Sequence, residues 1–219
     1  MVQQDLDKDY LYSVKNIINV LNSFLNHTRL DDFETDTYTY SYNKIIKHFE
    51  KLRTDNDYKN WLVIGSSIVY SWMPTILNFG GRESRNVKNK KDKIDFEQLI
   101  KDIDLKKIEK GKELEPLLKF INNSVVGMSK FLHFSFPENF PIWDSRVEFA
   151  LFNDKNKKTK NNFHRLNLKN YNKYRQSCIN IIQNNEDIFD KINEKIPTLN
   201  GLTKMRQIEF ILFQRGGTS

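Results

Sequence analysis

The sequence predicts an all-α protein built from many short helices. Apolar side chains recur at three- and four-residue spacing along most of the 219 residues, as they do on one face of a helix. Only the stretch TYTYSYN, residues 37–43, alternates in the manner of a strand, and it can equally lead into the next helix. The sequence contains neither an internal repeat nor a glycine-rich phosphate loop.

The helices are placed by their apolar residues and by the prolines between them. A helix over residues 57–72 ends before Pro74, because the residue that precedes a proline disfavours the helical conformation. A helix over residues 125–136 leads into the proline-bracketed loop FPENFPIW, and another helix follows Asp144. The remaining helices are expected over residues 11–25, 42–52, 95–103, 114–121, 168–182, 188–196 and 205–212.

Length and composition predict a single domain, residues 1–219. Hydrophobic residues make up 38% of the chain and aromatic residues 13%, which is enough to form a core. We expect two small helical lobes with the active site between them. One lobe would comprise residues 1–80 with the C-terminal helices, and the other residues 94–152.

Several classes of protein are disfavoured by the sequence. No run approaches the roughly 18 consecutive apolar residues of a membrane span, and MVQQDLDKDY lacks the pattern of a signal peptide. We therefore expect a cytoplasmic protein with no membrane partner, acting as a monomer. The lone Cys178 excludes an internal disulfide and is expected to be a buried thiol. No metal and no other cofactor is expected, because the histidines lack metal-ligand spacing: His27, His48, His133 and His164.

The charge of the chain makes a polyanion the first partner to consider. The formal net charge is +7 and the isoelectric point is about 9.3. The segment 80–93 holds six basic residues against two acidic ones, and residues 153–162 hold four lysines. Both segments could be solvated loops or could grip a phosphate backbone. The backbone candidates in the first segment are Arg82, Arg85, Lys88, Lys90 and Lys91.

Lys130 and Asp144 stand out in the central stretch VVGMSKFLHFSFPENFPIWDSRVEFAL. Lys130 lies in an apolar helix, where burial would lower the pKa of its amine and make it a nucleophile near neutral pH. Asp144 precedes a helix, where an aspartate accepts backbone N–H groups and is fixed in direction. The simpler interpretations are a lysine that extends its ammonium to water and an aspartate that only caps a helix.

Together these two groups suit cleavage of an N-glycosidic bond. A fixed carboxylate stabilises the positive charge that develops on the sugar as a base departs. An amine that attacks C1′ forms a covalent intermediate, which collapses to a Schiff base and can promote strand cleavage.

The same stretch resembles the active-site segment of the helix-hairpin-helix DNA glycosylase superfamily. PIWDSRVEFAL is similar to that family's proline–x–x–aspartate–x–x–valine segment, and GMSK to its glycine–x–x–lysine segment. The resemblance, nearest in style to compact 8-oxoguanine glycosylases, implies a helix-hairpin-helix fold, a Schiff-base lysine at Lys130 and an electrostatic partner at Asp144. Its expected partner is double-stranded DNA with a damaged or modified base.

The resemblance also suggests where DNA would be held. Family hairpins approach a phosphate through two glycines, whereas this chain has only Gly127; we expect Gly127, Ser129 and Arg146 to contact the backbone. An extruded base must stack in a pocket. The pocket candidates, each of which could instead belong to the core, are Trp143, His133, Trp72, Phe79, Phe213 and Gln214.

Three functions remain open from the sequence. The first is a DNA glycosylase, with or without strand-cleaving lyase activity, that acts in repair or in defence against phage with modified DNA. The second is a non-catalytic helical DNA-binding domain, and the third is a helical protein-interaction module. The sequence does not specify the base that would be removed.

Overall fold

The computed structural model describes residues 12–27, 36–54, 57–71, 111–152 and 167–217, with the backbone alone for residues 36–40. The regular elements within these ranges are all helices, with no strand among them, so the predicted all-α class is confirmed. The helix expected at 95–103 and the basic segments 80–93 and 153–162 lie outside the described residues. None of the described helices is both long and apolar enough to cross a membrane.

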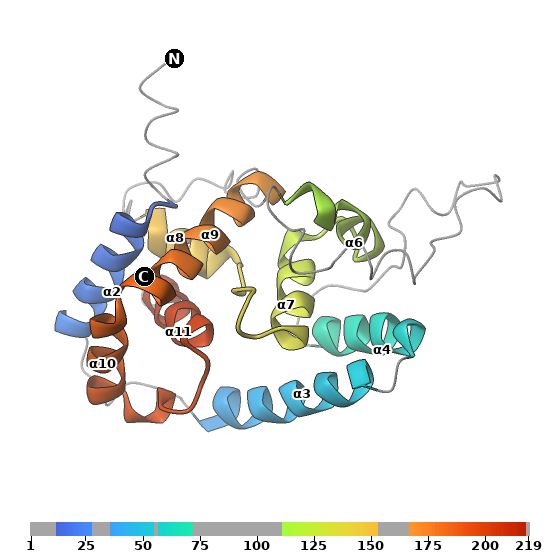
Figure 1. Ribbon diagram of the computed structural model, residues 1–219, viewed down its shortest axis with the longest axis horizontal. Coiled ribbons are helices and arrows are strands. Elements are labelled where there is room, and N and C mark those ends of the chain that lie inside the picture. The colour runs from blue at the N-terminus through green and yellow to red at the C-terminus, as the bar shows by residue number, and fades with distance from the viewer. Residues whose placement is uncertain (1–11, 28–35, 55–56, 72–110, 153–166, 218–219) are drawn as a thin grey trace, which may run out of the picture.

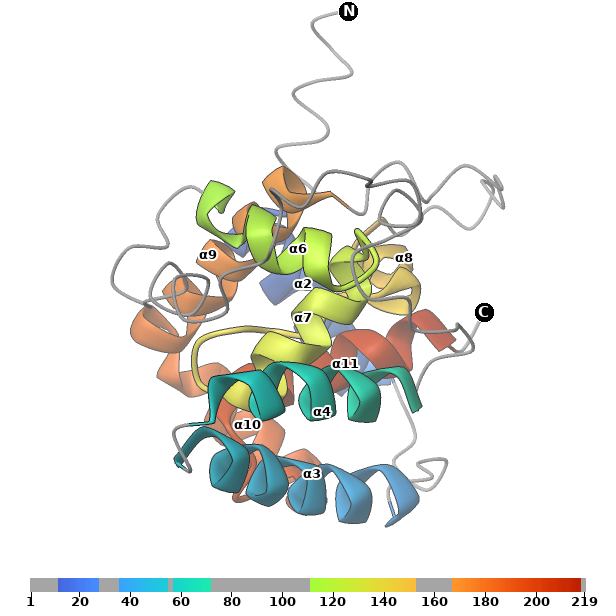
Figure 2. The same cartoon turned by 90° about the vertical axis from the view of Figure 1, so that its right-hand side faces the viewer.

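One group of helices surrounds α7 (Val125–Ser135). The helices α3 (Asp36–Thr54) and α4 (Tyr58–Ser71) pack against each other, and both pack against α7. Figure 2 shows α3 and α4 running side by side below α7. The short α6 (Glu115–Phe120), entered through the 3₁₀ turn η4 (Lys112–Leu114), contacts α7 from the other end of this group.

A second group joins the N-terminal helix to the C-terminal half of the chain. Its elements contact one another around α11 and lie on one side of the molecule in Figure 1. They are α2 (Val14–His27), α8 (Ser145–Phe152), α9 (Leu168–Asn184), α10 (Glu186–Lys195), the 3₁₀ turn η6 (Pro197–Leu199) and α11 (Lys204–Gly217).

This grouping differs from the lobes expected from the sequence. The helices α3 and α4, expected beside the C-terminal helices, pack on α7, while α8, expected beside α7, packs on α11. The difference arises at the loop between α7 and α8, which carries the chain from one group to the other. Lys130 in α7 and Asp144 at the start of α8 therefore belong to different groups of helices.

Residues 37–43, whose alternation resembles a strand, are helical and belong to α3. Tyr42 and Phe49 lie seven residues apart, and both are buried against α7. Two turns of a helix place residues at this spacing on one face. The aromatic residues of this segment are therefore buried by the spacing of a helix and not by the alternation of a strand.

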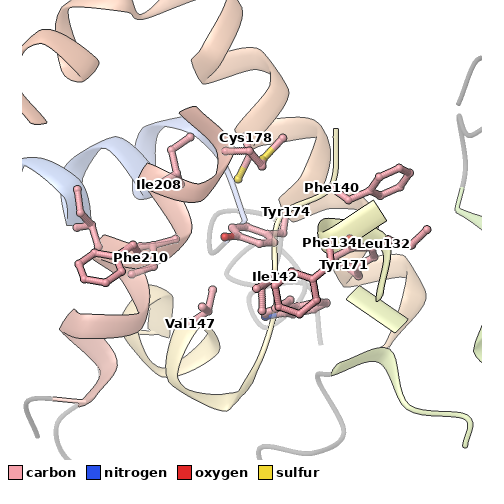
Figure 3. Packing of buried hydrophobic residues seen from close by; sticks show 14 of the residues in the cluster. Leu132, Phe134, Phe140, Ile142, Val147, Tyr171, Tyr174, Cys178, Ile208 and Phe210 are labelled. Carbon is pink, nitrogen blue, oxygen red and sulfur yellow. The ribbon is translucent and has the colours of Figure 1, made fainter. Parts of the chain in front are cut away.

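Aromatic packing continues across both groups of helices. Phe131 of α7 lies 5.0 Å from Trp61 and 5.7 Å from Phe49, measured between ring centroids. On the other side of α7, Trp143 stacks on Tyr171 at 5.9 Å. Figure 3 shows side chains from α7, α8, α9 and α11 gathered around the loop that leads into α8. A continuous core thus holds this loop in place.

Candidate active site

Lys130 is presented by the second turn of α7. Ser124 caps this helix, and its side chain accepts the N–H of Gly127 at 3.1 Å. The two neighbours of Lys130, Ser129 and Phe131, are fully buried, whereas Lys130 itself keeps part of its surface exposed. Lys130 is therefore anchored between buried neighbours while part of the residue remains exposed.

Asp144 caps α8, as the sequence predicts. One of its carboxylate oxygens accepts the N–H groups of Arg146 at 3.0 Å and Val147 at 3.1 Å. These two bonds fix the direction of the carboxylate at the positive end of the helix. Asp144 is partly exposed, so the carboxylate can act on a ligand as well as on its own helix.

The side chain of Ser129 joins the two segments that carry Lys130 and Asp144. Its Oγ accepts the backbone N–H of Trp143 at 3.0 Å. Its single proton lies within reach of the carbonyl oxygens of Trp143, at 3.2 Å, and of Val126, at 2.9 Å. The residue before the lysine is thus bonded to the residue before the aspartate.

Burial and neighbouring charges act in opposite directions on the Lys130 amine. Burial is the larger effect and lowers the pKa of Lys130 below its usual value. The carboxylates of Asp144 and Glu209 raise this pKa, and the guanidinium of Arg206 lowers it. Among the described residues Lys130 has no direct ion-pair partner. Its amine is therefore influenced by two carboxylates without being engaged by either.

Glu209 and Arg206 of α11 complete this group of charges, and sequence reasoning missed both. They form a direct ion pair and are almost fully buried, with 1% and 7% of their surface exposed. Burial raises the pKa of Glu209 to about 7, while Arg206 and Lys130 lower it and Asp144 raises it. The available signal was a pair of charges three residues apart in the stretch MRQIEFIL, whose other residues are apolar except for Gln207.

His133 is held in the core and is not available to a base. Its Nδ1 lies 2.6 Å from the carbonyl oxygen of Phe140, and its Nε2 lies 2.9 Å from the hydroxyl of Tyr42. Because a carbonyl can only accept, Nδ1 donates and Nε2 accepts the tyrosine proton. Burial, assisted by Arg206, lowers the pKa of His133 to about 3, so the ring is neutral. The expected base-pocket role of His133 is therefore wrong, because the ring is fully buried and both of its nitrogens are bonded within the protein.

Trp143 is also a core residue. It is fully buried, stacks on Tyr171 and meets the edge of Tyr12 at 5.6 Å. Its indole N–H donates to the buried carboxylate of Glu148 at 3.1 Å. The expectation that Trp143 would stack on a flipped base is wrong here, because protein groups cover the indole. Its role is to hold the loop before Asp144.

The expected backbone contacts of Gly127 and Ser129 are also not supported. Both residues are buried, and the Gly127 N–H is already bonded to Ser124. A Cβ on Gly127 would lie 2.9 Å from Ile121 and 3.0 Å from the Tyr70 hydroxyl. This glycine therefore permits close helix packing. Within the α6–α7 connection the left-handed conformation is instead taken by Asn122 and Asn123, at φ of 55° and 53°.

An exposed cationic edge lies beside Asp144. Arg146 is exposed, and its guanidinium lies 4.5 Å from the ring centroid of Phe213, which is partly exposed, as is the adjacent Gln214. A Cβ on Gly216 would lie only 1.9 Å from the Arg146 carbonyl oxygen. Glycine thus allows the end of α11 to reach the start of α8. Arg146, Phe213 and Gln214 therefore remain candidates for contact with a ligand.

Seven sequence candidates lie outside the described residues: Trp72, Phe79, Arg82, Arg85, Lys88, Lys90 and Lys91. In the part of the chain that is described, no cluster of three or more His, Cys, Asp or Glu side chains could hold a metal ion. The thiol of Cys178 is buried as predicted, and burial raises its pKa.

Comparison with protein-family models, with curated proteins and with solved structures gives no significant match to this chain. Any assignment of function therefore depends on the chemistry of the site itself. That site combines a lysine of lowered pKa with an aspartate whose carboxylate is fixed, and both residues are partly exposed. A buried ion pair between Arg206 and Glu209 contributes to its charges. The site can supply a nucleophile and stabilise a developing positive charge.

Proposed function

We propose that this protein is a DNA glycosylase that extrudes a damaged or modified base and cleaves its N-glycosidic bond. The observation that carries the proposal is that Ser129 and Trp143, the residues before Lys130 and Asp144, are bonded to each other, while the fixed Asp144 carboxylate acts on the charge of the partly buried Lys130. A surface lysine would keep its usual pKa and would be protonated near neutral pH. The lowered pKa of Lys130 is the property that an amine nucleophile needs.

Each residue has a distinct part in the proposed reaction. As the C1′–N bond breaks, the base leaves with the bonding electrons and takes up a proton, and Asp144 stabilises the positive charge on the sugar. The neutral Lys130 amine donates its lone pair to C1′ and then loses a proton. Opening of the sugar ring places a proton on O4′ and leaves a Schiff base between C1′ and Lys130. Loss of a C2′ proton then expels the 3′ phosphate, which is the lyase step.

The charges around the site favour a polyanionic substrate. The chain carries a net charge of +7, and exposed Arg146 lies next to Asp144 at the edge of the site. We assign Arg146 a contact to a phosphate that flanks the extruded nucleotide. Phe213, beneath the Arg146 guanidinium, would present an apolar surface to the same nucleotide.

Base release is the experiment that tests this function. The purified protein would be incubated with oxidatively damaged genomic DNA and with phage DNAs that carry modified bases, and the released bases would be identified by mass spectrometry. We expect the wild type to release at least one modified base and to leave abasic sites. Lys130→Gln and Asp144→Asn should each reduce release at least 100-fold. Release of no base, or of unmodified bases only, contradicts the proposal.

A control variant separates loss of chemistry from loss of charge. Lys119 is an exposed lysine of α6, and Lys119→Gln removes the same charge as Lys130→Gln. Lys119→Gln should release bases at the wild-type rate. If DNA binds in a salt-dependent manner but no base is ever released, the non-catalytic DNA-binding alternative is favoured. Absence of binding even at low salt leaves the protein-interaction alternative.

A further inference from the structure

The exposed side of α3 carries a row of basic side chains. Lys44, Lys47 and Lys51 are all exposed, and they follow one another at intervals of three and four residues. This spacing places them on one face of the helix, over about 10 Å of its length. His48 is also exposed and lies beside Lys44 and Lys51 on that face. These four residues form the α3 basic face.

The α3 basic face points away from the core and from Lys130. Tyr42 and Phe49 are buried against α7 and mark the inner side of α3. Because a helix has about 3.6 residues per turn, the three lysines lie on the opposite side of α3. Figures 1 and 2 both show α3 at the lower edge of the molecule, with α7 above it. The basic face is therefore a surface separate from the candidate active site.

Helix stability does not explain this row of lysines. Like charges three or four residues apart slightly destabilise a helix. Lys47 and Lys51 form no ion pair with any residue that the structure describes. Glu50, at the border of the face, is the one acidic residue of α3 whose side chain is described. Arg53 has a structural role instead, because its guanidinium donates to the Ser135 carbonyl oxygen at 3.0 Å.

The abundance of lysine in the chain does not explain the row either. The helix α10 exposes four acidic side chains and one lysine: Glu186, Asp187, Asp190, Lys191 and Glu194. That lysine lies 3.8 Å from the Asp187 carboxylate. Charges of opposite sign are thus gathered on different helices. A polyanion would be attracted to α3 and repelled by α10.

A nucleic-acid backbone fits the basic face better than a lipid surface does. A duplex presents one negative charge about every 1.7 Å along its axis, so it can meet all three lysines at once. Lysine contacts phosphate as a point charge and reads no base sequence in doing so. A helix that binds a membrane surface inserts its apolar face into the lipid. The apolar face of α3 is instead buried against its neighbours α4 and α7.

We propose that the α3 basic face binds the phosphate backbone of a nucleic-acid duplex without regard to base sequence. The inference goes beyond the proposed glycosylase function and does not depend on it, because this surface is separate from Lys130 and Asp144. Since the face points away from α7, the stretch of duplex that it holds is not the nucleotide that reaches Lys130. Its contribution is affinity for DNA that contains no target base.

Binding to duplexes without a modified base tests this proposal. Fluorescence anisotropy would measure the affinity of the wild type for two labelled DNA duplexes of unrelated sequence over a series of salt concentrations. We expect equal affinity for the two sequences and a steep decrease of affinity with salt. The variant Lys44→Gln/Lys47→Gln/Lys51→Gln should bind about 10-fold more weakly or worse, and the slope of log K against log salt should shrink by about 2–3.

Two control variants separate the basic face from net charge. Lys15→Gln/Lys119→Gln/Lys169→Gln removes three exposed lysines from α2, α6 and α9 and should bind as the wild type does. Replacement of the three α3 lysines by arginine keeps their charge and should also preserve binding. All these side chains are exposed, so thermal unfolding should show that each variant remains folded.

The outcomes distinguish this proposal from the glycosylase function. Equal losses of affinity in the two glutamine variants would show that only net charge matters and would overturn the proposal. A wild type that binds no duplex, or that uses these lysines on vesicles of phosphatidylserine and phosphatidylcholine but not on DNA, would overturn it as well. If the α3 lysines govern DNA binding but no base is ever released, the glycosylase function fails and the basic face stands. If bases are released but the α3 glutamine variant binds as tightly as the wild type, the basic face alone fails.

Discussion

Ser129 holds the backbone of Trp143 by accepting its N–H at 3.0 Å, with the Trp143 carbonyl oxygen 3.2 Å from the same hydroxyl. Both residues are fully buried, and each immediately precedes a proposed catalytic residue. One hydroxyl thus fixes the distance between the segments that carry Lys130 and Asp144. Because these segments belong to different groups of helices, the contact also joins the two halves of the core.

Ser129→Ala should weaken both the fold and the site. The substitution leaves the buried N–H of Trp143 without its acceptor, and the free energy of unfolding should fall by about 1–3 kcal/mol. Urea denaturation measures this loss. Ser67→Ala is a suitable control, because Ser67 is exposed on α4 and bonds only within its own helix. Equal stability of the two variants would show that the Ser129 bonds contribute nothing.

His133 should make the protein less stable in mild acid. The pKa of the folded ring is about 3, whereas an unfolded histidine has a pKa of about 6.5, so the unfolded state binds the proton first. The stabilising contribution is present above about pH 6.5 and is lost as the pH falls towards 3, by about 1.4 kcal/mol per pH unit. Denaturation series from pH 7 to 5 measure this slope.

In the variant His133→Gln, the free energy of unfolding should no longer show the decrease with falling pH that is due to His133. His48→Gln, which changes an exposed histidine of α3, should keep it. The same pH slope in His133→Gln and in the wild type would contradict the buried, neutral ring.

Glu148 should contribute strongly to stability. Its carboxylate accepts the Tyr12 hydroxyl at 2.8 Å and the Trp143 indole N–H at 3.1 Å, and only 2% of its surface is exposed. Glu148→Ala leaves both donors buried without this acceptor and should cost about 2–4 kcal/mol in chemical denaturation. Glu194→Ala on the exposed face of α10 should cost less than about 0.5 kcal/mol. A loss for Glu148→Ala as small as this would rule out the buried network.

Two adjacent glycines provide a matched test of how α11 meets α8. A Cβ at position 216 would lie 1.9 Å from the backbone oxygen of Arg146, but one at position 217 would lie 3.3 Å from its flexible guanidinium. Gly216→Ala should therefore destabilise the protein by about 2 kcal/mol or more and disturb the start of α8, whereas Gly217→Ala should be nearly neutral. Melting temperatures of both variants test this. Equal values would show that the two helices do not approach so closely.

The sequence predicts much of the fold because its signals are local. Helical periodicity places most of the described helices to within three residues at each end, although α3 begins six residues before and α11 ends five residues after the expected bounds. The aspartate before SRVEFALF caps α8, as expected. Helical periodicity also places Lys130 in a buried helix. Residues 37–43 show the limit of such signals. Their alternation resembles a strand, but a helix is the conformation that buries both Tyr42 and Phe49.

The rest of the site depends on contacts between distant segments. Glu209 lies 79 positions after Lys130 in the sequence, and only the packing of α11 brings its charge near the lysine. Trp143 looked available because it adjoins Asp144, yet consecutive residues at the start of a helix can face opposite directions. Gly127 looked like a phosphate contact, but the turn is made by Asn122 and Asn123, which tolerate the left-handed conformation.

Trapping of the covalent intermediate tests the central claim most directly. The wild type would be mixed with a duplex containing one abasic site, reduced with borohydride, digested with protease and analysed by mass spectrometry for the modified peptide. We expect an adduct on Lys130 that is absent from Lys130→Gln and retained by Lys119→Gln. A wild type that forms no adduct, or one attached to a different lysine, would contradict the proposed role of Lys130.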